Sequence, residues 1–399
     1  MPRPLLASLA AIAAWIVLLL CGELGLRLAG FRFNLPVFET LSERRVLEPA
    51  DAGKVKISPE LLQGRGFLFS YMLPHPGGEI TLQKKPGTFR VVLVADSSGH
   101  RLGQARPELE ECLGRKTGRP VELVNLSFAG CGSERTRATA AEALGLEPDL
   151  LIVSTGHSDF VSLCRPDTFT PGSEPRYSEG FRRAFESVRL LQMAAKLGGR
   201  WMESTIKREK LSEETRPLQR PYTPEERAKV QATLRENIDA VAAAAEAKGV
   251  PAMFLTMVKN YRRPPLWEGG RPDQLEPYLK LNQKELAAKE EVSPDPLTAY
   301  LLATKAWERG QVAEARKLFE TAHERSARSF VATASANAAI RDAAKKHGAV
   351  LVDAQDLIDR ASTKGLAGDE LMEDHCHLNP EGTRLVVREL CASLPLPPQ

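Results

Sequence analysis

The chain has 399 residues, of which 43% are hydrophobic and 26% are charged, and its formal net charge is +3. This composition is that of a globular protein, and the length suits one large domain or two of medium size. So small a net charge gives no reason to expect nucleic acid or an acidic polymer as a partner.

The N-terminal segment is apolar. Leu5 to Gly22 contain no charged residue, and as a helix this run would be about 27 Å long, close to the roughly 30 Å hydrocarbon core of a bilayer. We therefore predict a transmembrane anchor over residues 1–30. Arg3 precedes the run, which favours an extracytoplasmic, periplasmic side for the rest of the chain. A cleaved signal peptide is the alternative, although no Ala-x-Ala site follows the run.

Residues 31–87 are rich in proline, glycine and charge and show weak periodicity, which predicts a juxtamembrane linker that packs partly on the domain. From residue 88 onward, short aliphatic runs alternate with amphipathic segments. The runs predict strands at Phe89–Ala95, Val121–Leu126, Asp149–Ser154, Pro251–Met257 and Ala349–Asp353. The segments between them predict helices at Arg106–Lys116, Glu134–Ala143, Pro224–Lys248 and Ser335–Lys346. This alternation predicts a three-layer α/β/α sandwich with a mostly parallel sheet, over residues 88–399.

Two helical insertions interrupt this alternation, at about 177–211 and 276–326. Within the second, residues 297–322 resemble a single tetratricopeptide helical hairpin, with small and aromatic residues where two helices would interlock. A lone hairpin cannot bury its own apolar face. We therefore favour a helical lid packed on the sheet domain over a partner-binding array.

The six cysteines allow either redox compartment. If the domain is exported, Cys112 could pair with Cys391, or Cys131 with Cys164. No cysteine spacing is a zinc pattern, and Cys376 with His377 is too little for a metal site. No metal or cofactor is predicted.

Two motifs at opposite ends of the predicted domain indicate nucleophilic chemistry. Ser97 follows the first strand, in Ala95-Asp-Ser97, and Asp374 precedes His377 by three residues. A hydroxyl, an imidazole and a carboxylate are the components of a Ser-His-Asp nucleophile. A serine that caps a helix is the alternative reading of Ser97. His375 and, more weakly, His100 are rival candidates for the base.

These motifs, with two blocks between them, resemble in chain order the SGNH (GDSL-type) hydrolases. Asn125 to Ser133 resemble the block whose glycine donates a backbone N–H to the oxyanion hole, and Gly130 matches that glycine. Gly156-His-Ser-Asp159 resembles the next block, but Ser158 stands where the family has asparagine. The resemblance implies Ser97 as nucleophile, His377 as general base and Asp374 as its orienting carboxylate, in a flavodoxin-like fold. His157 would line the pocket or lie on a surface loop.

The predicted function is a membrane-anchored serine hydrolase of the esterase or deacetylase type. The resemblance implies an ester-bearing small molecule, a lipid or an acetylated glycan as substrate. Two alternatives stay open: a catalytically degenerate scaffold with a binding role, motivated by Ser158, and an O-acyltransferase of envelope polysaccharide. A phosphodiesterase or nuclease is disfavoured by the near-neutral charge and the lack of a metal-binding cluster.

Overall fold

The computed structural model describes residues 3–31, 46–50, 53–57, 79–160, 187–194, 223–265, 272–326 and 331–394. The chain forms two compact units, Met1–Thr40 with Gly172–Leu218, and Leu41–Pro171 with Gln219–Gln399.

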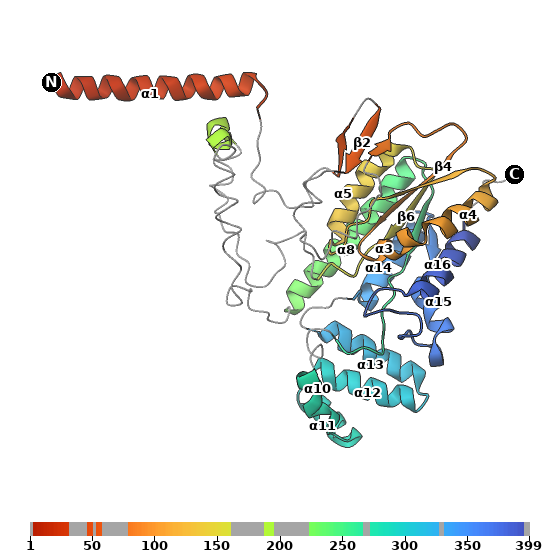
Figure 1. Ribbon diagram of the computed structural model, residues 1–399. Helices are drawn as coiled ribbons and strands as arrows, with labels where there is room; N and C mark the ends of the chain where they lie inside the picture. The colour runs from red at the N-terminus through yellow and green to blue at the C-terminus, as the bar shows by residue number, and fades with distance from the viewer. Residues whose placement is uncertain are drawn as a thin grey trace. The chain divides into compact units, whose positions relative to one another are not determined.

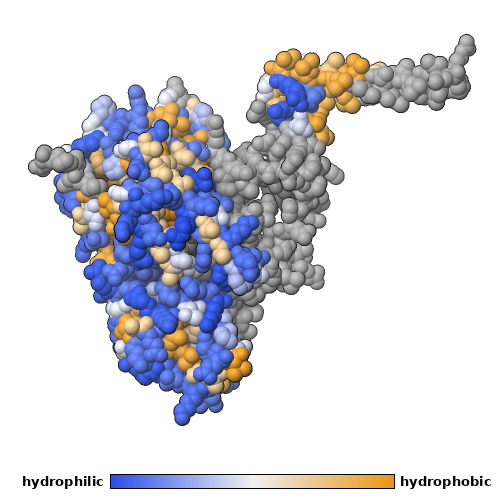
Figure 2. Space-filling model, turned by 180° about the vertical axis from the view of Figure 1, so that it is seen from behind, coloured by the Kyte–Doolittle hydropathy of each residue, from blue (hydrophilic) through white to orange (hydrophobic). Residues whose placement is uncertain are grey.

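The first unit contains helix α1 (Arg3–Leu28). Its exposed apolar side chains include Trp15, Leu18 and Leu20 and form an orange patch in Figure 2. Within the described ranges, no helix combines the length and apolarity needed to cross a membrane, so the transmembrane prediction is not confirmed. Most of the predicted insertion at 177–211 lies outside the described residues; in the part that is described, the backbone N–H groups of Arg189 and Leu190 donate to Glu23 of α1.

The second unit is built on a five-stranded parallel sheet. Its strands are β4 (Phe89–Ala95), β5 (Val121–Asn125), β6 (Leu150–Ser154), β7 (Ala252–Leu255) and β8 (Val350–Val352), in the order β5-β4-β6-β7-β8. The five predicted strands are thus confirmed. The chain leaves β4 for one neighbour, β5, and then crosses to the other, β6. Parallel sheets bind ligands beyond the carboxyl ends of the strands, at such a reversal of strand order.

Helices cover both faces of this sheet (Figure 1). Val91, Leu93 and Ala95 of β4 join an apolar core with α3 (Ser98–Gln104), α4 (Arg106–Thr117), α15 (Ala354–Ala361) and α16 (Pro380–Ala392). Val92 and Val94 join the opposite core with α5 (Ser133–Ala143), α8 (Pro224–Ala247) and α14 (Ala334–Lys346). Side chains alternate between the faces of a strand, so burial on both faces requires the continuous apolar run of β4.

The segment predicted to be a linker contains a small antiparallel sheet. Its strands are β1 (Leu47–Pro49), β2 (Lys54–Ile57) and β3 (Glu79–Thr81). Val55, Ile57 and Ile80 are buried in the same core as α5 and α8. Strands of three or four residues are too short to show a period of two in the sequence, which is why the sequence does not predict them.

The insertion at 276–326 consists of helices, as predicted. They are α10 (Pro272–Leu279), α11 (Gln283–Val292), α12 (Pro296–Glu308) and α13 (Val312–Arg325). α12 and α13 pack together as a hairpin through buried alanines and the rings of Tyr300 and Phe319, whose centroids are 5.6 Å apart. These residues belong to the same core as β4 and α16, so the hairpin packs on the sheet domain. Its likeness to a tetratricopeptide repeat stays a prediction.

A disulfide joins Cys112 of α4 to Cys391 of α16, one of the two pairings considered from the sequence. Cys131 is also disulfide-bonded, and Cys164, the partner considered for it, lies outside the described residues. Cys21 and Cys376 are free thiols.

Candidate active site

Ser97 lies between the end of β4 and the start of α3, at the carboxyl edge of the sheet. Ser97 occupies the N-cap position of α3, but its side chain makes no capping hydrogen bond to that helix. Instead, its Oγ lies 2.8 Å from Nε2 of His377, a residue 280 positions along the chain. α3 lies close to the loop that follows β5: a Cβ placed on Gly99 of α3 would be only 2.1 Å from Oγ of Ser127 on that loop.

Asp374 and His377 lie on the loop between α15 and α16. Nδ1 of His377 is 2.6 Å from Oδ2 of Asp374, and Oδ1 of Asp374 accepts the backbone N–H groups of Cys376 and His377, each at 2.8 Å. Burial raises the pKa of Asp374, but these hydrogen bonds, first that from His377, outweigh it and hold the pKa well below its usual range. The carboxylate is therefore ionised and can only accept.

This geometry decides which ring nitrogen of His377 holds the proton when the ring acts as a base. Because the Asp374 carboxylate only accepts, Nδ1 carries the ring proton, and Nε2 is left as an acceptor for the Ser97 hydroxyl. Asn379 caps α16 by accepting the N–H groups of Glu381 and Gly382 at 3.0 Å each, which fixes the end of the loop. Ser97, His377 and Asp374 thus form a continuous hydrogen-bonded relay.

Asp96, beside Ser97, ties the strand-end loops together. It is fully buried; one oxygen accepts the N–H of Ser98 at 2.9 Å, and the other accepts those of Gly156 (3.2 Å) and His157 (3.1 Å). The turn around Ser97 is therefore held against the loop that follows β6. Gly156 takes a φ of 143°, which residues with side chains rarely adopt.

Gly130 and Ser158 lie on the loops after β5 and β6. Gly130 has a φ of 71°, in the left-handed region that favours glycine, and Ser158 is buried. The two loops are joined by Asp159, which accepts from the N–H (3.2 Å) and the hydroxyl (2.6 Å) of Ser133. The loops predicted to form the oxyanion hole are thus linked to each other, and through Asp96 to Ser97. The roles of Gly130 and Ser158 as oxyanion donors stay predictions.

The other histidines considered from the sequence take different positions. His375 lies 3.0 Å, through Nε2, from the carbonyl oxygen of Pro264, away from the relay, and His100 contacts Gln104. His157 is buried, not on a surface loop. Its Nδ1 accepts the N–H of Ala332 at 2.9 Å, and burial lowers its pKa to about 4. His157 is therefore neutral at pH 7.

Cys376 is a neighbour of the relay to which sequence reasoning gave no role. Its Sγ lies 3.7 Å from Nδ1 of His377, and among the described residues it forms with Asp374 and His377 a group whose ligand atoms all lie within 4.8 Å of one another. Cys376 and His377 as a pair do not predict a metal site.

Comparison with known proteins gives distant structural likenesses only. No protein-family model and no curated protein matches the chain. A GDSL-like lipase from Bacteroides thetaiotaomicron is 12% identical, with 78% of this chain and 89% of the other covered and a TM-score of 0.35. LAE5, an alpha/beta hydrolase enzyme from the Lake Arreo metagenome, is 15% identical, with 76% of this chain and 94% of the other covered and a TM-score of 0.36. TesA is 13% identical, with 76% of this chain and 97% of the other covered and a TM-score of 0.33. Likenesses at this level carry no functional argument, so the function has to be inferred from the geometry of this chain.

Proposed function

We propose that this protein is a serine hydrolase that cleaves esters through an acyl-enzyme on Ser97. The observation that carries the proposal is the relay from Ser97 Oγ to His377 Nε2 (2.8 Å) and from His377 Nδ1 to Asp374 Oδ2 (2.6 Å). It lies at the carboxyl edge of a parallel sheet, where the order of strands reverses. Nucleophile, base and orienting carboxylate are each within hydrogen-bond reach of the next, as this chemistry requires.

In the first half of the reaction, Ser97 Oγ attacks the ester carbonyl while its proton passes to Nε2 of His377. The ionised carboxylate of Asp374 holds the ring in the required tautomer and stabilises the imidazolium. The tetrahedral intermediate collapses when His377 returns that proton to the alcohol oxygen, which leaves. The acyl group is then bonded to Ser97.

In the second half, water takes the place of the alcohol. It gives a proton to His377 and attacks the acyl carbonyl, and the proton returns to Ser97 as the acid departs. In both halves the negative charge on the carbonyl oxygen needs donors, which we assign to the backbone N–H of Gly130 and the hydroxyl of Ser158. One such donor contributes on the order of 10²–10³ in rate.

The Cys112–Cys391 disulfide supports an oxidising location for the domain. We therefore propose that the enzyme works outside the cytoplasm, on esters present there. The membrane anchor stays a prediction from the sequence.

A fluorophosphonate probe tests the proposal, because it phosphonylates only a serine that is activated as a nucleophile. We expect the wild-type chain to be labelled on Ser97 and Ser97→Ala to remain unlabelled, with circular dichroism showing both folded. If folded wild-type protein is not labelled, the binding role that Ser158 motivates becomes the better interpretation.

A further inference from the structure

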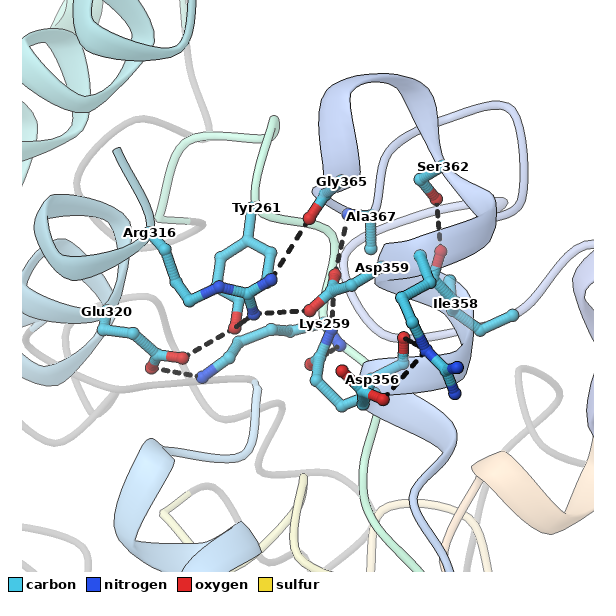
Figure 3. Close-up of polar contacts among 12 residues, drawn as sticks. Lys259, Tyr261, Arg316, Glu320, Asp356, Ile358, Asp359, Ser362, Gly365 and Ala367 are labelled. Carbon is cyan, nitrogen blue, oxygen red and sulfur yellow. Dashed lines mark hydrogen bonds and ion pairs between the residues drawn. The ribbon is translucent and has the colours of Figure 1, made fainter. Parts of the chain in front are cut away.

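A partly buried polar network links the α12–α13 hairpin to the sheet domain (Figure 3). Glu320 of α13 accepts from Nζ of Lys259 at 2.5 Å and from the hydroxyl of Tyr261 at 2.6 Å. One turn earlier on α13, Arg316 donates to Asp359 of α15 at 2.5 Å. The side chains of Lys259 and Asp359 are each 1% exposed. Charges so deep in a protein are costly unless every partner is in place.

The segment that contributes Lys259 and Tyr261 also holds the loop with the catalytic pair. Asn260, between them, donates its backbone N–H to the carbonyl oxygen of His375 (2.9 Å) and its side-chain amide to that of Asp374 (3.2 Å). Arg263 donates to the carbonyl oxygen of Glu373 at 3.0 Å. Three consecutive carbonyl groups of this loop are therefore bound by one short segment.

The network contacts the same loop at a second point, Ala367. Its N–H donates to Asp359 at 2.9 Å, and its carbonyl oxygen accepts the N–H of Tyr261 at 3.2 Å. Arg316 also donates to the carbonyl oxygen of Gly365 at 3.1 Å. The hairpin thus contacts the start of the loop through Arg316 and its partner Asp359. It contacts the catalytic end of the loop indirectly, through the segment that contains Lys259 and Tyr261.

We propose that Glu320 and Arg316 are positioning residues: the helical hairpin clamps residues 259–263, and this segment sets the place of Asp374 and His377 relative to Ser97. The inference rests on the proposed function, since it assigns these residues to the same relay. A displacement of about 1 Å at a reacting group can cost on the order of 10²-fold in rate, so a clamp of this kind has a measurable effect.

The test compares Glu320→Ala with Arg90→Leu. Arg90 has a side chain with 0% exposure and pairs with Glu122 at the opposite end of the sheet, so it is a control for the loss of a buried ion pair. At a temperature where both variants are folded, we expect Glu320→Ala to slow fluorophosphonate labelling and lower the kcat for p-nitrophenyl acetate by about 10–100-fold, with KM changed less than about threefold. Arg90→Leu should keep wild-type rates. Glu320→Gln, which retains an acceptor oxygen, should recover part of the loss.

Hydrogen exchange separates a failure of this inference from a failure of the proposed function. We expect Glu320→Ala to raise the exchange rates of backbone amides in residues 366–378 at least tenfold, while Arg90→Leu leaves them unchanged. This readout needs no enzymatic activity. Wild-type exchange and labelling in Glu320→Ala would overturn the clamp, whereas unlabelled wild-type protein with the expected exchange would overturn only the hydrolase.

Discussion

The two ends of the parallel sheet use buried charge for different purposes. At the amino end of β4, Arg90 donates to Glu122 (2.8 Å) and to the carbonyl oxygens of Leu82 (2.9 Å) and Leu146 (2.7 Å). Nearby, Asp149 accepts from Lys84 (2.7 Å) and from the N–H of Arg90 (2.7 Å). These charges join β4 to its neighbours and leave no nucleophile among them.

At the carboxyl end of the same strand, the buried charges hold other polar groups in place for chemistry. Asp96 binds three backbone N–H groups around Ser97, and the network of Glu320 and Arg316 supports the loop of Asp374 and His377. The comparison shows that burial of a charged group does not by itself indicate its role. The groups that it contacts determine whether it stabilises the fold or positions the catalytic residues. Substitutions at the carboxyl end should therefore affect rate more than stability, and those at the amino end the reverse.

The largest effect is expected from the relay itself. His377→Ala removes the base, and Asp374→Asn favours the wrong tautomer of the ring, so each should lower kcat by about 10⁴-fold or more. Neither side chain belongs to an apolar core, so the melting temperature should stay within a few degrees. Hydrolysis of p-nitrophenyl acetate and thermal unfolding measure the two quantities. A loss of rate that parallels a loss of folding would remove the contrast between the two ends.

The disulfide provides the reverse case. Cys391 lies near the end of α16, about 16 Å along the helix from the residues next to His377. The bond closes a loop of 279 residues, and the chain-entropy relation gives about 5.6 kcal/mol for it, slightly above the range of measured effects. We expect the free energy of unfolding in urea to fall by a large part of this amount in the double variant Cys112→Ser, Cys391→Ser. Below its melting temperature, the variant should still react with the fluorophosphonate probe at the wild-type rate. Unchanged stability would show that the bond does not constrain the unfolded chain.

A pH experiment addresses Asp159 and His157, two buried groups at the carboxyl end. Burial raises the pKa of Asp159 from 3.8 to about 6, so its contribution to stability is present below about pH 4 and lost as the pH rises through about 6. Burial lowers the pKa of His157 from 6.5 to about 4, so its contribution is present above pH 6.5 and lost as the pH falls through about 4. Each pKa shift corresponds to about 3 kcal/mol of stability. Between pH 4 and 6.5 the two contributions change in opposite directions, because the one from Asp159 falls with rising pH while the one from His157 grows.

In a variant that lacks one of the two groups, the pH dependence of stability should therefore follow the other group alone. We expect Asp159→Asn to lose stability more steeply than wild type between pH 6.5 and 4, and His157→Gln to lose less or to gain. The free energy of unfolding by urea at several pH values, taken relative to pH 7 for each variant, measures this difference. Curves for both variants that run parallel to wild type would mean that neither group changes its protonation on unfolding in this range.

Short sequence patterns were enough to predict the sheet and the relay. The polar network of Lys259, Glu320 and Asp359 could not be predicted, because its members lie far apart along the chain. The run of β4 is apolar on both faces and ends in Ser97, and Asp374 with His377 lie within one turn of sequence, so each was visible in a short window. Lys259, Glu320 and Asp359 come from three separate segments, and in the sequence Glu320 resembles any other charge on the amphipathic helix α13. Which charges become partners is decided by tertiary packing, which no single sequence window contains.

The smallest effect is expected at Ser158, and it refines the contrast between the two ends. The serine hydroxyl is shorter than the asparagine amide that the SGNH resemblance places there, so Ser158→Asn should keep or raise the rate, by up to about tenfold, a fraction of what one oxyanion donor contributes. Ser158→Ala removes the donor and should lower the rate by about 10²-fold while stability changes little, since the hydroxyl is small. Labelling rates and thermal unfolding of both variants decide the point. If Asn slows the reaction as much as Ala does, the loop after β6 is shaped around serine itself, and the carboxyl end of this sheet has departed from the pattern that its sequence resembles.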